Sequence, residues 1–557
     1  MGKFGLMAGT AAIALLTASG AHAAVAKNDA ATASKDNGAP TVVAGQIQLA
    51  QNTMPSQGSS GSTADLEARV RALEESLAAR DDRFQSDHTR LSTLEQQYNY
   101  AAWTFDNGRP VIASGDGRFT MGVRVRFQSD FAGFSQDSTH PAGFAGPSDL
   151  SSGAVIRRAY FGVEGKAYSD FAYEFRLNAG GSNGGSAGAS GVPTGGEGDP
   201  LLNKAVVTYT GIPNWHFNVG IIEPAFMFEG TTSSASLMFL ERPEIDNIAA
   251  DVFGAGDSRR GIEIGWAKTD TLWAGDNITA TATFSGQKTG SSANHGNGGD
   301  ENTQILGRVT DRLWTNGFSN IQIGFSGAKV LNSGSLSGAG GGSQAINLQD
   351  RPEVRVDGTR LISTGGIASK TADMFAVDLG GNIDNFFLGG EYAQFTLDRQ
   401  CGSIAAAANA VCARSTAVID HPTFSGWYAE ASWILTGETK AYSPAAINNE
   451  VGGFNGPVPS RPFSLSGGSW GAFELVARYS NTDLNWHTNQ LATTSQLAGV
   501  LGGEERVIAL GLNWYLNRNV RVMIDDNIIK VKKGTAALPN RDGQDINVLG
   551  VRLQFAN

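Results

Sequence analysis

The stretch RFTMGVRVRF, residues 118–127, decides the fold class. Its apolar residues (Phe119, Met121, Val123, Val125 and Phe127) alternate with Arg118, Thr120, Gly122, Arg124 and Arg126. Successive side chains of a strand point to opposite faces, so one face is apolar and the other carries three cations. The outward face of a soluble sandwich is usually mixed. This pattern therefore favours a strand with lipid on one side and a water-filled lumen on the other.

The same alternation recurs in segments of about ten residues along the rest of the chain. Members of the series include residues 158–164, 171–178, 215–221, 262–266, 278–284, 321–325, 427–433, 473–479, 510–516, 520–524 and 549–555. We count about sixteen candidates, an even number, as a closed antiparallel barrel with both ends on one side requires. The sequence therefore predicts an all-β fold, a transmembrane antiparallel β-barrel of about 16 strands over residues 101–557.

Composition agrees with a large membrane barrel. The chain has 557 residues, 72 of them Gly, with 41% hydrophobic residues and a mean hydropathy of −0.17. Beyond the N-terminus no apolar run reaches the roughly 18 residues of a membrane-spanning helix. The net charge of −11 disfavours nucleic-acid binding, which requires a concentrated basic face.

Three segments precede the predicted barrel. Residues 1–23 have the features of a signal peptide: Lys3, an apolar run from Leu6 to Leu16, and the Ala21-His22-Ala23 cleavage site. Residues 24–62 read as a flexible leader. Residues 63–100 carry a heptad seam that predicts a periplasmic coiled coil gathering protomers, most simply into a homotrimer. A single amphipathic helix packed on the rest of the chain is the alternative. The seam comprises Leu66, Val70, Leu73, Leu77, Phe84, Leu91, Leu94 and Tyr98.

The connectors between predicted strands are alternately short and long. Short ones, such as Tyr168-Ser169-Asp170, suit periplasmic turns, and long Gly/Ser-rich ones, such as residues 331–370, suit outer loops. Cys401 and Cys412 flank one such loop and could close a disulfide after export. Aromatic residues near strand ends fit interfacial girdles; they are Trp103, Trp215, Tyr392, Trp427, Trp486 and Tyr515.

The connector from Glu223 to Asp257 is too apolar for a solvated outer loop. We expect it to fold into the lumen as a constriction loop, and contact with a neighbouring protomer is the alternative. Four arginines share lumen parity on early strands: Arg124, Arg126, Arg158 and Arg176. Arg157 has the opposite parity, so it can face the lumen only at a bulge or at the start of a strand. The arginines either pass anions or pair with lumen acids such as Glu164 and Glu174 and brace the wall.

From about Gly108 onward the chain resembles the phosphate- and polyphosphate-selective outer-membrane porins. The resemblance rests on separated blocks at residues 157–165 (RRAYFGVEG), 239–242 (FLER), 351–353 (RPE), 435–438 (LTGE), 468–480 (GSWGAFELVARYS) and 510–517 (LGLNWYLN). It implies a trimer of sixteen-stranded barrels with basic pore residues, and Arg157-Arg158 match residues that contact phosphate in the family. The resemblance also implies that the site residues of the constriction loop are Glu223, Phe226, Glu241 and Arg242. Glu223 stands where the family has a basic residue, which disfavours a strongly electropositive funnel.

These patterns predict a passive porin in the outer membrane of a Gram-negative bacterium, surrounded by lipid and passing small anions such as phosphate. An adhesin or envelope-tethering protein with a filled barrel remains the alternative. The seven histidines are scattered, and none lies beside an obvious nucleophile and acid. We therefore expect no enzyme activity, catalytic residue, metal site or cofactor.

Overall fold

The structure is a computed structural model. It describes residues 63–99, 102–106, 108–136, 150–181, 202–289, 301–334, 345–401, 418–444, 452–490, 498–534 and 542–557. The expected signal peptide (1–23), the leader (24–62) and Cys412 lie outside these residues. The chain divides into two units, Met1–Phe84 and Gln85–Asn557.

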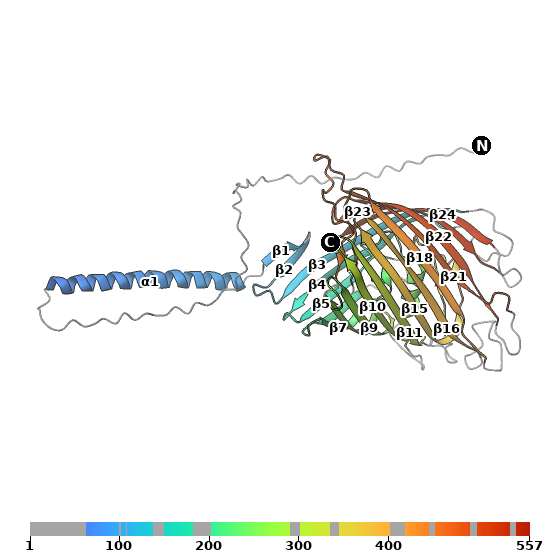
Figure 1. The fold of residues 1–557 in the computed structure, drawn as a ribbon, viewed down its shortest axis with the longest axis horizontal. Coiled ribbons are helices and arrows are strands. Elements are labelled where there is room, and N and C mark those ends of the chain that lie inside the picture. The colour runs from blue at the N-terminus through green and yellow to red at the C-terminus, as the bar shows by residue number, and fades with distance from the viewer. Residues whose placement is uncertain are drawn as a thin grey trace, which may run out of the picture. The chain divides into compact units, whose positions relative to one another are not determined.

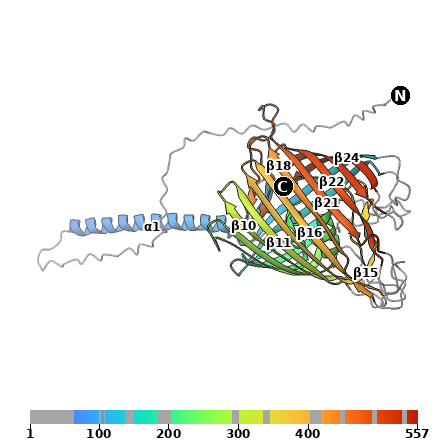
Figure 2. The ribbon, with the colours of Figure 1, turned by 45° about the vertical axis from the view of Figure 1, so that its right-hand side comes forward.

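Sixteen long antiparallel strands of the described residues form one closed barrel, which confirms the predicted fold class. Figures 1 and 2 show these strands running obliquely side by side. In chain order they are β3 (Thr120–Gln136), β4 (Gly153–Ala167), β5 (Phe171–Asn178), β6 (Leu202–Tyr209), β7 (Trp215–Ile222), β8 (Arg259–Thr269), β9 (Asn277–Lys288), β10 (Thr303–Thr315), β11 (Asn320–Asn332), β15 (Ile367–Ile383), β16 (Phe386–Cys401), β18 (Thr423–Ile434), β21 (Ala472–Trp486), β22 (Val500–Tyr515), β23 (Val520–Lys532) and β24 (Asp542–Ala556).

The first and last of these strands close the barrel. β24 pairs antiparallel with β3, with Phe555 opposite Phe127 and Arg552 opposite Asp130. Closure pairs the backbone groups that an open sheet edge would expose to lipid, where each unpaired group costs several kcal/mol, on the order of 2–7.

Short elements decorate the barrel. A hairpin of β1 (Ala102–Asp106) and β2 (Arg109–Ala113) extends the edge of β3. Two short helices, α2 (Phe228–Thr231) and α3 (Glu244–Phe253), lie between β7 and β8. The remaining strands are β12 (Ala345–Ile346), β13 (Gln349–Asp350), β14 (Ile362–Ser363), β17 (Val418–Asp420), β19 (Tyr442–Ser443) and β20 (Gly453–Phe454).

The two faces of each long strand follow the alternation in the sequence. On β3, Phe127 and Phe131 are 37% and 53% exposed, whereas Gln128 and Asp130 between them are completely buried. Arg118 precedes β3 and pairs with Asp116 at 2.5 Å, so only two of the three expected cations belong to the strand's inner face.

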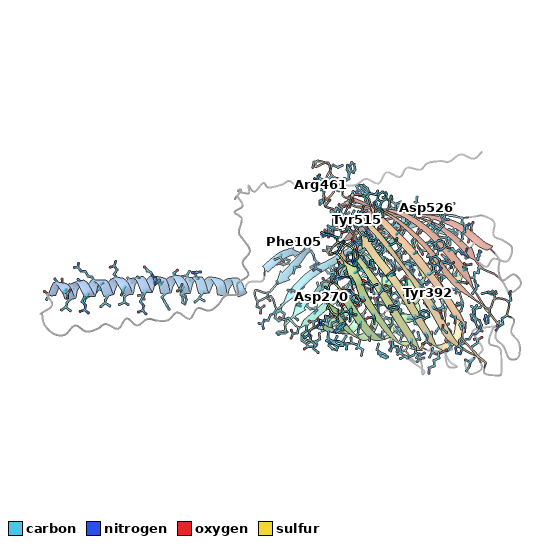
Figure 3. The ribbon with its side chains drawn as sticks, viewed as in Figure 1. Phe105, Asp270, Tyr392, Arg461, Tyr515 and Asp526 are labelled. Carbon is cyan, nitrogen blue, oxygen red and sulfur yellow. The ribbon has the colours of Figure 1, made fainter. Side chains whose placement is uncertain are left out.

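Most of the predicted girdle residues lie on the outer face, but Trp486 and Tyr515 do not. Trp486 packs against the buried core, and the guanidinium of Arg399 lies 5.3 Å from the centre of its ring. Tyr392, labelled in Figure 3, is 40% exposed on β16, and Trp427 is 43% exposed on β18. Tyr515 is buried, and its hydroxyl donates to Glu474 at 2.8 Å. Tyr515 has the same parity as the buried Asn513 and therefore faces inward. The prediction placed it in the girdle because it lies at the end of a strand.

α1 (Thr63–Asn99) covers the predicted coiled-coil segment as one helix. Its seam residues from Leu66 to Leu91 are between 51% and 71% exposed, so they are open to a partner helix. Self-association through this seam stays a prediction. Among the described residues, no helix combines the length and apolar character needed to cross a bilayer.

Candidate pore site

The segment from Glu223 to Ser258, here called the inner loop, joins β7 to β8 and is buried. Phe226, Met227, Leu237 and Phe253 are all completely inaccessible within the single chain. These apolar side chains are therefore not available to a neighbouring protomer, which was the alternative explanation for them. Gly254 ends α3 in the left-handed conformation (φ 82°), which glycine adopts without a Cβ clash, and the chain then enters β8.

Polar side chains from strands far apart in sequence hold the backbone of the inner loop. Asn513 on β22 donates to the carbonyl of Met238 at 2.9 Å, and Arg521 on β23 donates to that of Leu237 at 2.8 Å. Gln128 on β3 donates to the carbonyl of Ser234 at 2.9 Å. Since these side chains belong to the buried parity of their strands, the inner loop packs against the inner wall of the barrel.

Glycines on that wall make room for the inner loop. A Cβ on Gly380 of β15 would lie 2.6 Å from the ring of Phe228, and one on Gly426 of β18 would lie 2.4 Å from a methyl carbon of Ile245. Phe228 also stacks on Phe387 with ring centroids 6.4 Å apart. The loop and the wall are thus fitted to each other closely.

Glu241 of the inner loop is surrounded by three arginines. Its carboxylate accepts from Arg157 Nε at 2.6 Å and from Arg552 Nη2 at 3.1 Å, and Arg355 lies 3.5 Å away. Burial alone would raise the pKa of Glu241, but the surrounding arginines hold this pKa well below the usual range of a glutamate. Glu241 is therefore an ionised clamp between the loop and the strands β4 and β24.

A second inner segment, residues 345–366, also packs inside, which corrects the assignment of residues 331–370 to an outer loop. Val354, Leu361 and Ile362 are at most 2% exposed. Glu353 of this segment pairs with Arg478 on the buried parity of β21 and accepts from Ser480 at 2.6 Å. The sequence prediction rested on the Gly/Ser-rich residues at the start of this connector and overlooked the apolar and charged residues after them.

A cavity of about 290 Å³ lies between the inner loop and the wall of β3 to β6. Seven of the nine residues singled out in the sequence line it, while Phe226 and Glu241 are buried outside its lining. The seven are Arg124, Arg126, Arg157, Arg158, Arg176, Glu223 and Arg242. Segments separated by more than a hundred residues in the chain therefore meet around one polar space.

A bulge brings both Arg157 and Arg158 to this side of β4. The register between β3 and β4 shifts after the pair Gln128–Arg158, so that Ser129 lies opposite Ile156 and the register skips Arg157. Arg157 and Arg158 are 6% and 4% exposed. Of the two placements expected for Arg157, a bulge or the start of a strand, the structure shows the bulge.

The cavity arginines divide into two electrostatic classes. Arg124 contacts Glu164 at 3.1 Å and Glu174 at 3.4 Å, and Arg176 pairs with Glu174 and Glu223. Pairing neutralises these two guanidinium groups and ties neighbouring strands together, as the bracing alternative expects.

Arg126 and Arg158 belong to the second class. Arg126 donates to the hydroxyls of Ser234 (2.6 Å) and Ser233 (2.9 Å), and Arg158 donates to Gln128 at 2.9 Å. Across the described part of the chain, neither forms an ion pair with a carboxylate. Within the described residues, no carboxylate therefore neutralises their positive charges at the cavity.

Sequence reasoning missed Arg355 and Lys204, which also line the cavity. Lys204 pairs with Glu174 at 3.2 Å, and its position on the inner face of β6 could have been found from parity. Arg355 reaches the cavity only because the second inner segment folds inward. The local sequence pattern does not predict this inward course.

Comparison with known proteins adds to this geometry. The family model described as phosphate-selective porin O and P matches residues 121–556. The chain belongs to this family. It is therefore an outer-membrane porin of a Gram-negative bacterium, and the members of this family are channels rather than enzymes.

Individual relatives are distant. Porin O of Pseudomonas aeruginosa is 22% identical over 78% of this chain and 87% of its own length. An uncharacterized protein of Caulobacter vibrioides is 31% identical, over only 24% of this chain and 23% of its own length. Two solved structures align over 79% of the chain: the outer membrane channel DcaP of Acinetobacter baumannii (97% of that chain, 10% identity, TM-score 0.39) and an anion-selective porin from Comamonas acidovorans (100%, 12%, 0.40).

Proposed function

We propose that the protein is a passive porin whose lumen prefers small oxyanions, phosphate among them. The observation that carries the proposal is the pair of guanidinium groups, Arg126 and Arg158, that face the cavity and have no carboxylate partner in the described part of the chain. A guanidinium stays charged at any working pH and donates several hydrogen bonds in a planar fork that matches an oxyanion. The description of the family as phosphate-selective supports the same choice of solute.

In this proposal the inner loop is the constriction, and an anion passes between it and the strands β3 to β6. Arg242 on the loop extends the cationic lining, because within the described residues its side chain donates only to the backbone carbonyls of Glu229 and Thr232, at 2.6 and 2.7 Å. The paired acids Glu164, Glu174 and Glu223 line the same cavity and moderate its positive potential. We therefore expect a modest anion preference rather than an exclusive one.

We also propose that the porin is a homotrimer gathered by the periplasmic coiled coil. The support is the exposed heptad seam of α1, which a single helix leaves uncovered.

Planar-bilayer recording tests the proposed transport. The purified protein should open steadily in potassium chloride without added substrate, whereas an adhesin with a filled barrel would not conduct. Added phosphate should reduce the chloride current, because an oxyanion resting on Arg126 and Arg158 occupies the path of chloride. Chloride added at matched ionic strength serves as the control and should raise the current. A current that phosphate leaves unchanged would refute the oxyanion preference.

A further inference from the structure

The inner loop meets the wall formed by β16, β18 and β22 through acids on both sides. The loop contributes Glu229, Glu244 and Asp246, and the wall contributes Glu391, Glu430 and Glu505. All six side chains are at most 4% exposed. Burying an ionised carboxylate without a cation or a hydrogen-bond donor is strongly unfavourable, so this arrangement requires an explanation.

Two of the contacts bring an acid of the loop against an acid of the wall, Glu244 against Glu505 and Glu229 against Glu430. Among the described residues, no side-chain donor reaches the carboxyls of Glu244, Glu505 or Glu430. Since an ionised carboxylate can only accept, each pair requires one proton between its two members.

The cations near these pairs are already engaged. Arg478 pairs with Glu353, Lys440 with Glu474 at 2.8 Å and Arg308 with Asp378 at 2.7 Å. The titratable and charged groups that face the six acids are Arg242, Arg308, Arg478, Lys440, Tyr428, Asp350, Glu353 and Asp378, and the backbone amides of Phe228, Gly230 and Glu244 also reach them. The described residues include no group of three or more His, Cys, Asp or Glu side chains placed to hold a metal ion. Protons are therefore the available counter-charge.

The opposite side of the inner loop is fastened differently. There Glu241 is ionised and clamped by Arg157 and Arg552. On the acid side, burial first and neighbouring acids second raise the pKa of Glu244 well above its ordinary value and that of Asp246 to about 8. Arginines thus hold the side of the inner loop at Glu241 at every working pH. The side that carries Glu229 and Glu244 is held only while its carboxyl pairs keep a proton.

We propose that the inner loop carries a proton-controlled latch, formed by the pairs Glu244–Glu505 and Glu229–Glu430, which releases this edge of the loop from the wall in alkaline solution. Each pair attracts while it shares one proton and repels once both carboxyls are ionised. Release lets the edge of the loop move in the lumen while Glu241 keeps the other edge in place.

The sign of the pH effect follows from proton linkage. An acid whose pKa is raised on docking binds its proton more tightly in the docked state, so docking is favoured at low pH. For Asp246, the stabilisation is complete below the ordinary value of 3.8 and is lost as the pH rises to about 8. The pKa of Glu244, a member of the latch, is raised in the same direction, so the latch is closed in mildly acidic solution and opens as the pH rises.

Recording at two pH values tests the latch. Between about pH 6 and about pH 9.5, the unmodified channel should change from steady current to frequent transitions between levels, with a rise in their rate of roughly tenfold. The variant Glu430→Gln/Glu505→Gln should stay steady at both values, because an amide donates to an ionised glutamate without a proton. Glu504→Gln serves as the control, since Glu504 pairs with Arg506 on the other parity of β22. It should respond like the unmodified protein.

Infrared spectroscopy gives a readout that does not depend on current. The unmodified protein should show the C=O stretch of a protonated carboxyl at neutral pH that disappears on titration to about pH 9.5, and the double glutamine variant should show less of it. Equal pH sensitivity in the double variant, a missing carboxyl band, or transitions that respond to a chelator instead of pH would overturn the latch. A steady channel with no anion preference would refute the proposed function and leave the latch standing.

Discussion

The double variant Arg126→Gln/Arg158→Gln should lose most of the anion preference of the channel. Two unit charges facing one cavity disappear, and each interacts with an anion about 4 Å away by about 1 kcal/mol even at the dielectric constant of water. That energy corresponds to roughly a fivefold change in local anion occupancy for each arginine. The measurement is the reversal potential in asymmetric potassium chloride, which should move toward the value of an unselective pore.

The variant Arg176→Gln/Glu223→Gln is the matched control. It removes a charged pair from the same cavity without changing the net charge, and Glu174 keeps Arg124 and Lys204 as partners. Its reversal potential should stay close to that of the unmodified channel. If the control shifts as far as the double arginine variant, selectivity does not arise from the arginines that lack carboxylate partners.

Replacing Glu241 by glutamine should destabilise the folded barrel by about 3–5 kcal/mol, the usual cost of removing one partner from a buried charge network. Glu241 is 1% exposed, and its substitution removes the carboxylate that Arg157 binds at 2.6 Å and weakens the tie of Arg355 to the inner loop. Urea unfolding of the protein in lipid vesicles measures the change through its midpoint and slope.

Asp373→Asn is the control for this substitution. Asp373 pairs with Lys329 at 2.7 Å, but both side chains are 42% exposed or more, so the substitution should cost only about 0–1 kcal/mol. Equal unfolding midpoints for the two variants would show that Glu241 does not clamp the inner loop.

The strands of the barrel could be predicted because alternation is a local property. Each strand has lipid on one side and polar contents on the other, so Phe127 and Gln128 reveal their faces without knowledge of their neighbours. An irregularity at Arg157 was also predictable, since two adjacent arginines cannot face the lumen of a regular strand, but the sequence left a bulge and the start of a strand as alternatives.

The contents of the barrel were only partly predictable. The apolar residues of the inner loop indicated burial, but the inward course of residues 345–366 depends on long-range contacts such as Glu353 with Arg478. Periodicity says nothing about such contacts.

The division of the arginines into braced and available groups was likewise beyond the sequence. Arg124 and Arg126 have the same parity and flank the same residue, Val125, yet of the two only Arg124 meets Glu164 and Glu174. Which arginine finds an acid depends on the stagger between strands and on the path of the inner loop, because Ser233 and Ser234 of that loop occupy Arg126.

The most direct test of the proposed lumen is the reversal potential of the unmodified channel between two concentrations of potassium chloride. We expect a potential whose sign shows that chloride passes more readily than potassium, of modest size because paired acids share the cavity. A potential of the opposite sign, showing preference for potassium, would contradict the assignment of Arg126 and Arg158 as the groups that select solutes.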